Sequence, residues 1–121
     1  MKENKSAAEF LCACAAEDGI LNVLAIFFPK GTIVRIPCMR SVCEQSVDNL
    51  ELSPRAYHCL MRANIRTIRE LVDSLESQSI MKIRNLGAKS AAEIRRKLLA
   101  FSYEALSEPA KVAFWAGMLK R

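Results

Sequence analysis

The chain has 121 residues and a formal net charge of +5, with 51% hydrophobic and 26% charged residues. This balance describes a soluble globular protein with room for one small domain and an extension, and it excludes a disordered tail or two full domains. The longest apolar run, residues 20–28, is too short to span a bilayer, and acidic residues interrupt any signal-peptide core near the N-terminus. We therefore expect a cytoplasmic protein without a membrane partner.

The positive charge is concentrated in the second part of the chain. Residues 1–45 carry five basic and five acidic side chains and sum to zero, whereas residues 46–121 carry thirteen basic and eight acidic ones. Six cations lie between Lys82 and Lys97, against the single acidic residue Glu93. A basic helix on a neutral background is typical of a nucleic-acid-binding face, although solvated charges alone also produce it.

The first 45 residues predict two helices and a strand. Residues 6–18 are rich in alanine and begin with a capping box of Ser6 and Glu9, and residues 20–28 place apolar side chains at helical spacing. Residues 32–36 are β-branched and bounded by Gly31 and Pro37, which indicates a strand. That strand needs a partner, either residues 21–28 if they are extended or the same strand of a second copy, so residues 1–45 are a candidate homodimerisation element.

Four cysteines in this region suggest a zinc site but fit one poorly. Cys12 and Cys14 have C-x-C spacing, and Cys38 and Cys43 have C-x₄-C spacing, whereas zinc sites favour paired C-x₂-C. On a helix, Cys12 and Cys14 point about 200° apart and cannot bind one ion. With five cysteines and no export signal, we expect reduced, buried thiols and no metal.

Residues 46–121 predict a series of short helices. Ser53 and Pro54 begin one helix, Thr67 and Glu70 form a capping box for residues 68–75, and Ser107 begins a last helix that runs to about residue 120. Shorter and longer helices are expected at residues 79–84 and 88–100. In the helix that begins at Pro54, the buried stripe holds Ala56, Cys59, Leu60 and Ala63. The outward stripe of the same helix holds Arg55, His58 and Arg62.

The stretch from residue 80 to residue 97 predicts a helix end, a tight turn at residues 85–87 and the start of a basic helix. Because Gly87 lacks a Cβ, the backbone there can take a positive φ and can approach another molecule closely. Ala88, Lys89 and Ser90 would then place unpaired backbone N–H groups, a cation and a hydroxyl at a helix N-terminus, which suits a phosphate. The alternative is an ordinary helical corner with a surface lysine.

Four motifs in the right order carry a specific resemblance. Residues 47–52 (VDNLEL), 55–60 (RAYHCL), 67–71 (TIREL) and 84–90 (RNLGAKS), followed by Glu93 and Ile94, resemble the C-terminal domain of the bacterial RNA polymerase alpha subunit. The resemblance covers about residues 46–102 and leaves out residues 1–45 and the last helix. Because the assembly domain of that subunit is absent, we interpret the chain as a free-standing copy of the module.

The resemblance implies a mainly α fold, a compact bundle of short helices with a helix-hairpin-helix-like corner, here with an N-terminal extension of helices and a strand. We expect three segments: the extension at 1–45, a DNA-binding domain at 46–104 and a C-terminal helix at 105–121. The family inserts into the minor groove of A·T-rich promoter DNA. Its DNA-binding motif positions fall here on Arg55, His58, Cys59, Gly87, Lys89, Ser90 and Glu93.

The sequence departs from the family pattern at three positions. His58 replaces the usual Asn, so DNA contacts would weaken as pH rises, and Ala88 replaces what is often a second cation. The acidic patch with which the family meets the sigma factor is represented by Asp48 and Glu51, while Asn49 stands where a second acid is common. The sigma contact is therefore expected in diminished form, and helix-entry polarity alone also explains both acids.

These observations predict a non-enzymatic, DNA-binding transcription module without a cofactor. One alternative keeps the fold but moves the function to protein contacts with a sigma factor or activator. Another is a helix-hairpin-helix accessory that targets a nuclease or repair enzyme to DNA. Catalysis is not expected, because the sequence has one histidine, no Gly-rich nucleotide loop, no nucleophile elbow and no evident catalytic pair of carboxylates.

Overall fold

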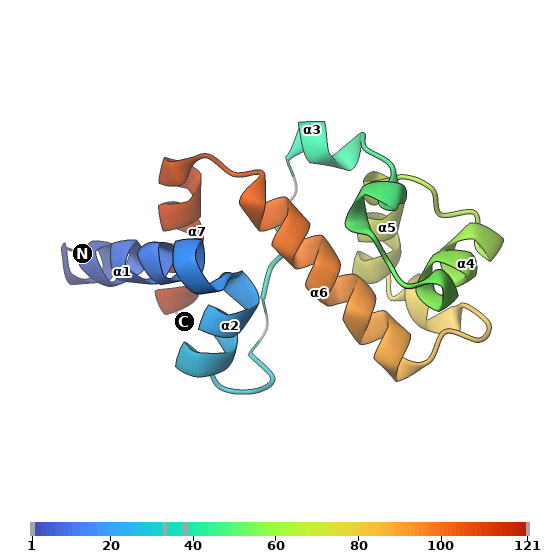
Figure 1. Ribbon diagram of the computed structural model, residues 1–121, viewed down its shortest axis with the longest axis horizontal. Helices are drawn as coiled ribbons and strands as arrows, with labels where there is room; N and C mark the ends of the chain where they lie inside the picture. Colours follow the sequence, from blue (N-terminus) through green and yellow to red (C-terminus); the bar gives the residue numbers. More distant parts are fainter. Residues whose placement is uncertain (1, 33, 38, 121) are drawn as a thin grey trace. The chain divides into compact units, whose positions relative to one another are not determined.

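Helices account for nearly all regular structure in the protein (Figure 1). The computed structural model describes residues 2–32, 34–37 and 39–120, with side chains from residue 7 onward. The chain divides into two compact units, one made of Met1–Pro37 with Ser102–Arg121 and the other of Cys38–Phe101. We call them unit 1 and unit 2. The predicted mainly α fold is confirmed.

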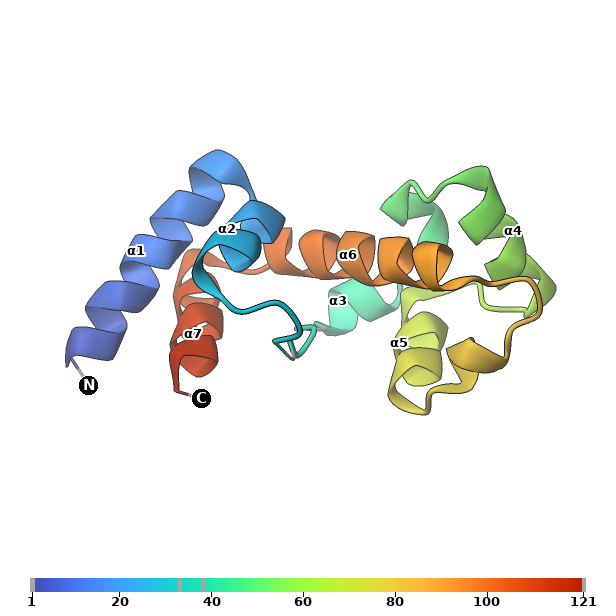
Figure 2. The same cartoon turned by 90° about the horizontal axis from the view of Figure 1, so that it is seen from below.

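Unit 1 joins the two ends of the chain. It contains α1 (Lys2–Asp18), α2 (Ile20–Phe27), α7 (Glu108–Leu119) and the last residues of α6 (Ala88–Glu104). α1 packs against both α2 and α7, as Figures 1 and 2 show. Gly19, with φ 88°, turns the backbone between α1 and α2, a conformation that a residue with a Cβ rarely adopts. The observed α2 and α7 confirm the helices predicted at residues 20–28 and after Ser107.

The core of unit 1 is a cluster of aromatic side chains with satisfied polar atoms. Trp115 Nε1 donates a hydrogen bond of 2.8 Å to Tyr103 Oη, and the Tyr103 hydroxyl in turn donates to Cys12 Sγ at 3.9 Å. The Cys12 thiol donates to a Glu108 carboxylate oxygen at 3.7 Å. Burial raises the pKa of the Tyr103 phenol above its usual range. Cys12 is therefore part of the packed core. The Phe28 ring stacks on Trp115, with 6.0 Å between the ring centroids.

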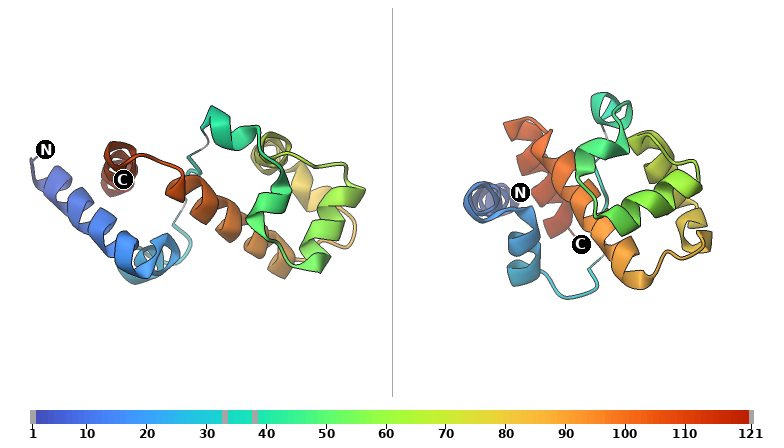
Figure 3. Two further views of the ribbon diagram at one scale, coloured as in Figure 1. Left: turned by 45° about the horizontal axis from the view of Figure 1, so that its top comes forward. Right: turned by 45° about the vertical axis from the view of Figure 1, so that its right-hand side comes forward.

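Unit 2 holds the remaining short helices around an apolar core (Figure 3). They are α3 (Arg40–Cys43), η1 (Val47–Leu50), α4 (Pro54–Arg62), α5 (Ile68–Glu76), η2 (Ser79–Lys82) and α6 up to Phe101. The core is formed mainly by aliphatic side chains at the predicted helical spacings, including Val47, Leu50, Ala56, Leu60, Ile68, Leu71, Leu75, Ile80, Ile94 and Leu98. Ala63, predicted to lie in the buried stripe, is exposed, because α4 ends at Arg62 and the backbone turns away.

Side-chain caps define where the helices of unit 2 begin. The Ser53 hydroxyl accepts the Ala56 N–H before α4, and Pro54 occupies the first helical position. At α5 the capping box is complete: Glu70 N–H donates to the Thr67 hydroxyl at 3.2 Å, and Thr67 N–H donates to the Glu70 carboxylate at 3.0 Å. These starts, predicted from the sequence, are confirmed.

The predicted strand at residues 32–36 is wrong for the residues that the structure describes. Residues 32 and 34–37 are not in a strand, and Ile33 lies outside the described residues. The Thr32 hydroxyl and N–H both turn back to the Pro29 carbonyl, which closes a local turn, and Pro37 lacks a donor. The partner expected within the chain is not extended either, since residues 20–27 are helical and the isolated bridge between Ser46 and Thr67 lies elsewhere.

Two further predictions about the first 45 residues need correction. α1 begins at Lys2, so Ser6 lies inside the helix and does not precede it as an N-cap. Cys12 and Cys14 are free thiols, as expected, whereas Cys43 is disulfide-bonded. The number of cysteines and the missing export signal carry no information on the pairing of one particular thiol. Cys38 lies outside the described residues.

Neither a metal cluster nor a membrane span occurs within residues 2–32, 34–37 and 39–120. No group of three or more His, Cys, Asp or Glu side chains is arranged to hold a metal ion there. Over the same residues, no helix combines the length and the apolar character that crossing a bilayer requires.

The capping box at α5 gives a direct test of the fold of unit 2. We expect Thr67→Ala to lower the free energy of unfolding by about 1 kcal/mol, since it removes the acceptor for the Glu70 N–H. Thr67→Ser keeps the hydroxyl and should remain close to the wild type. Urea unfolding followed by far-ultraviolet circular dichroism measures both variants, and equal loss in the two would show that the hydroxyl does not stabilise the helix.

Candidate nucleic-acid interface

A surface hollow of about 610 Å³ lies where the start of α4 meets the first turns of α6, within unit 2. Figure 1 locates both helices. The hollow is lined by Ser53, Arg55, Gly87, Ala88, Lys89, Ser90, Glu93, Arg96 and Lys97. Five of the seven residues predicted for DNA binding, Arg55, Gly87, Lys89, Ser90 and Glu93, are therefore brought together, although they come from helices about thirty residues apart in sequence.

Arg55 occupies the second position of α4, directly after Pro54, and its side chain is exposed. The Ser53 cap fixes the first turn of the helix, so the direction in which Arg55 leaves the backbone is set by local structure. The side chain is neither hidden inside the fold nor turned away from Gly87 and Lys89. A guanidinium in this position presents several donors to one shared hollow.

The turn before α6 takes its left-handed conformation at a residue other than Gly87. The left-handed residue of the turn is Asn85, with φ 69°, and Gly87 does not have a positive φ. Gly87 immediately precedes α6, and its carbonyl accepts the Ala91 N–H at 3.0 Å. A Cβ added there would meet no atom within 4 Å. Neither backbone conformation nor internal packing explains the missing side chain, which leaves room for another molecule to approach the helix start.

The first turn of α6 supplies the donors that an anion requires. Residues 88–90 are its first three residues, so their N–H groups lack partners within the helix, and the helix dipole adds partial positive charge. The Lys89 side chain is exposed and Ser90 is half-buried, and both line the hollow. Backbone donors, a cation and a hydroxyl thus converge as the sequence predicts, in a form that suits a phosphate.

Glu93 joins the two helix starts. Its carboxylate accepts hydrogen bonds from the Ser53 N–H at 2.7 Å and from the Ser53 hydroxyl at 2.8 Å. The backbone hydrogen bond from Ser53 is the main cause of a pKa below the usual range, and the Lys97 ammonium, 3.1 Å away, contributes. Only 15% of the Glu93 side chain is exposed. Its part in the interface is therefore to hold α4 and α6 in place.

Lys97 is held in place by contacts within unit 2, whereas three other cations that line the hollow form no ion pair among the described residues. Besides Glu93, Lys97 Nζ donates to the Glu51 carbonyl at 2.6 Å. Among the described residues, no carboxylate lies within 4 Å of the charged groups of Arg55, Lys89 or Arg96. The hollow therefore keeps a positive field despite the carboxylate at its base.

The two remaining predicted DNA residues lie outside the hollow. His58 is exposed on α4, one turn after Arg55, with its ring edge-on to Tyr57 at 5.9 Å. Cys59 is only 3% exposed, and its thiol donates to the Asn85 carbonyl at 3.6 Å. This contact fixes α4 against the turn that leads into α6, so Cys59 can act on a ligand only through the position of that turn.

The two predicted protein-contact residues, Asp48 and Glu51, are both exposed. Asp48 lies in the first turn of η1, where its N–H donates to the Ser46 hydroxyl at 3.0 Å. The Asp48 carboxylate accepts a hydrogen bond from the Tyr57 phenol, which is the main cause of a raised pKa for Tyr57. Glu51 ends η1 with φ 52°. Both carboxylates are accessible to a protein partner.

Arg96 and Lys97 line the hollow, yet the site predicted from the sequence did not include them. A signal was present for Arg96, because Lys89 and Arg96 are seven residues apart on one helix and therefore share a face. The hydrogen bond from Lys97 to the Glu51 carbonyl joins residues far apart in sequence, so no local sequence pattern predicted it. Ser53 was predicted only as a cap, and its bonds to Glu93 depend on tertiary structure.

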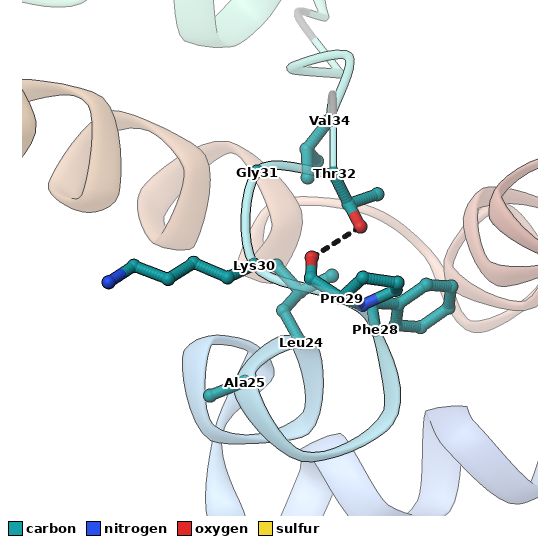
Figure 4. A pocket seen from close by; sticks show the side chains of 8 residues that line it. All are labelled: Leu24, Ala25, Phe28, Pro29, Lys30, Gly31, Thr32 and Val34. Atoms are coloured by element: carbon teal, nitrogen blue, oxygen red, sulfur yellow. Dashed lines mark hydrogen bonds between the residues drawn. The ribbon is translucent and has the colours of Figure 1, made fainter.

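A second hollow, of about 450 Å³, lies in unit 1 and has a different chemical character. Leu24, Phe28, Pro29 and Val34 give it mainly apolar walls, as Figure 4 shows. Lys30 is its one cationic lining residue, and in Figure 4 its ammonium extends away from Phe28 and Pro29. This hollow lacks the convergent donors found in unit 2 and offers no comparable site for nucleic acid.

Comparison with known proteins agrees with the sequence motifs. The family model of the C-terminal domain of the bacterial RNA polymerase alpha chain matches residues 37–100. The DNA-directed RNA polymerase subunit alpha of Symbiobacterium thermophilum is 50% identical over 58 residues, which are 48% of this protein and 18% of that subunit. The same subunit of Staphylococcus aureus strain Newman is 49% identical over 57 residues, again 18% of its length. No solved structure matches the sequence.

The lowered pKa of Glu93 predicts a pH dependence of stability. Its contribution is fully present above the unfolded-state pKa of about 4.5 and is lost as pH falls through the lower folded-state value. In Glu93→Gln we therefore expect a shallower loss of unfolding free energy below pH 4.5 than in the wild type. Lys97→Met, which keeps both bonds from Ser53, should retain most of the dependence. Urea unfolding at pH 3 to 6 measures this, and identical pH profiles for Glu93→Gln and wild type would contradict it.

Proposed function

This protein belongs to the family of the C-terminal domain of the bacterial RNA polymerase alpha chain, and from that premise we propose that it is a non-enzymatic DNA-binding transcription module. In this proposal the hollow between α4 and α6 contacts A·T-rich duplex DNA near promoters in the bacterial cytoplasm. The matched relatives are polymerase subunits, and the matched region spans only 18% of their length.

The observation that carries the proposal is the convergence of Arg55 with the first turn of α6 on one hollow. The minor groove of A·T-rich DNA is narrow and has an enhanced negative potential, which favours an inserted guanidinium. It presents no unique base code, so one arginine with few other base contacts suits it. Arg55 supplies that group from the start of α4.

The first turn of α6 then accounts for the flanking backbone. Lys89, the Ser90 hydroxyl and the unpaired N–H groups of residues 88–90 are directed at an anion, and the open space beside Gly87 admits a phosphate close to the helix. Glu93 and Cys59 act indirectly in this proposal, because their hydrogen bonds hold α4 and α6 in register.

The number of available cations sets the expected strength. With Arg55, Lys89 and Arg96 engaged, the slope of log affinity against log salt is about −2.7, which corresponds to about a forty-fold loss between 50 and 200 mM salt. Three such contacts are few for a specific complex, and we expect one copy to bind near the non-specific range of roughly 10⁻⁴–10⁻⁶ M. Pairing of two copies would strengthen binding through effective concentration.

The exposed carboxylates of Asp48 and Glu51 favour a second proposal on the same fold. They supply an acidic surface for a basic partner protein, such as a sigma factor or a transcription activator, beside the DNA-binding hollow of unit 2. If the protein binds such a partner while duplex DNA of any sequence leaves it unbound, the adaptor function replaces DNA binding. Preference for junctions or single strands over A-tracts would instead favour a repair accessory.

Arg55→Ala tests the leading proposal. We expect it to weaken binding to an A·T-rich duplex by about 5- to 150-fold, the equivalent of about 1–3 kcal/mol, because it removes the group that enters the groove. Arg69→Ala, an exposed arginine on α5 that does not line the hollow, is the matched control and should change affinity little. Fluorescence anisotropy on A·T-rich and G·C-rich duplexes at two salt concentrations measures both, and equal affinities for Arg55→Ala and Arg69→Ala would refute the assignment.

A further inference from the structure

Arg96 lines the hollow of unit 2 but is not among the DNA-binding positions expected from the sequence. Its side chain is exposed, and no carboxylate of the described residues lies within 4 Å of its guanidinium. Given the proposed function, on which this inference rests, we propose that Arg96 contacts a phosphate on the DNA strand opposite to the one that Lys89 contacts. In this arrangement α6 crosses the minor groove, and Arg55 enters the groove between the two cations.

The spacing along α6 places Lys89 and Arg96 on one face of the helix. Seven steps of about 100° bring the second side chain to within about 20° of the first around the helix axis. The rise of about 1.5 Å per residue separates the two positions by about 10.5 Å along the axis. Two cations that share a face two turns apart can contact two separate phosphates.

The start of α4 is attached to α6 between these two cations. The Ser53 N–H and hydroxyl donate to the Glu93 carboxylate at 2.7 and 2.8 Å. Glu93 comes four residues after Lys89 and three before Arg96. Arg55 follows Ser53 by two residues and lines the same hollow. A guanidinium that enters the groove from there has Lys89 toward the start of α6 and Arg96 toward its other end.

The order of charges along α6 distinguishes two directions in which the helix can lie on DNA. If α6 followed one strand, Glu93 would face a phosphate between those contacted by Lys89 and Arg96, because phosphates recur about every 3.4 Å of duplex axis on each strand. The carboxylate would repel that phosphate. If α6 crosses the minor groove, which is about 6 Å wide, the two cations face the two phosphate walls and Glu93 lies over the opening between them. A carboxylate between two cations therefore favours the crossing.

The neighbouring Arg95 provides a matched control for Arg96. Both side chains are exposed, and neither forms an ion pair with a carboxylate of the described residues. Arg96 lines the hollow, whereas Arg95 does not, since it lies about 120° away from Lys89 around α6. Substitution of either arginine removes the same charge from the same helix, so a difference between the two variants reports the position of the side chain.

The salt dependence of binding measures whether Arg96 contacts DNA. With an A·T-rich duplex, fluorescence anisotropy between 50 and 200 mM salt should show about a forty-fold loss of affinity for the wild type. Arg96→Ala should lose only about twelve-fold, because each phosphate contact contributes about −0.9 to the slope of log affinity against log salt. Arg95→Ala should behave like the wild type. Equal salt dependence of the two arginine variants would overturn the inference.

A duplex with one partly neutral strand tests whether the contacts lie on both strands. The probe has a palindromic A·T-rich segment, so both orientations of the protein are equivalent, and methylphosphonates replace the phosphates bordering that segment on one strand. A protein that contacts both strands always loses one contact, and the wild-type slope should change from about −2.7 to about −1.8. Arg96→Ala should have the same slope on this duplex as on the unmodified one. An unchanged wild-type slope would place α6 along the charged strand and overturn the inference.

The outcomes separate this inference from the proposed function. A wild type without salt-dependent binding to any duplex would refute DNA binding, and the inference with it. If the wild type binds, Arg55→Ala weakens binding and Arg96→Ala matches Arg95→Ala, the proposed function stands and the inference alone is refuted.

Discussion

The carboxylate of Glu93 is the contact on which the geometry of the interface depends. It accepts both donors of Ser53, the residue that caps α4, and it is itself part of α6. The starts of α4 and α6, which are 34 residues apart in sequence, are thereby fixed at one spacing, which is what the proposed recognition of a groove with flanking phosphates requires. A negative charge in a phosphate site would normally oppose binding. Here Lys97 pairs with it and the start of α4 faces it, so Arg55, Lys89 and Arg96 determine the field of the hollow.

In the turn before α6, one residue takes the left-handed backbone conformation and another leaves open space at the start of the helix. Asn85 takes the left-handed conformation, which asparagine tolerates better than most residues, and its carbonyl accepts the Cys59 thiol. Gly87 therefore does not need the left-handed conformation, and its missing side chain leaves open space at the helix start. Cys59, a buried residue, therefore contributes to the hollow indirectly, because it holds the turn that presents Gly87, Ala88 and Lys89.

Local signals were sufficient for several helix starts, but not for the start of α1 or for the contacts between helices. The caps at Ser53, Thr67 and Ser107 were predictable because their side chains act within one turn. The family motifs predicted one site for Arg55 and residues 87–90, and in the structure these residues line one hollow. The bonds from Ser53 to Glu93 and from Lys97 to Glu51 join residues forty or more positions apart, and no periodicity encodes them. The strand predicted at residues 32–36 was wrong for the described residues. The β-branched side chains there favour an extended backbone, but they do not supply a second strand to pair with it.

The proposed function leaves one copy of the protein with few contacts to DNA. Unit 2 carries the basic hollow, whose three available cations are too few for tight binding by one copy. Adding cations would raise affinity for every sequence alike, since phosphate contacts do not read bases. Joining two copies increases the number of groove contacts instead, and a site with two properly spaced A·T-rich segments then gains more than a random duplex.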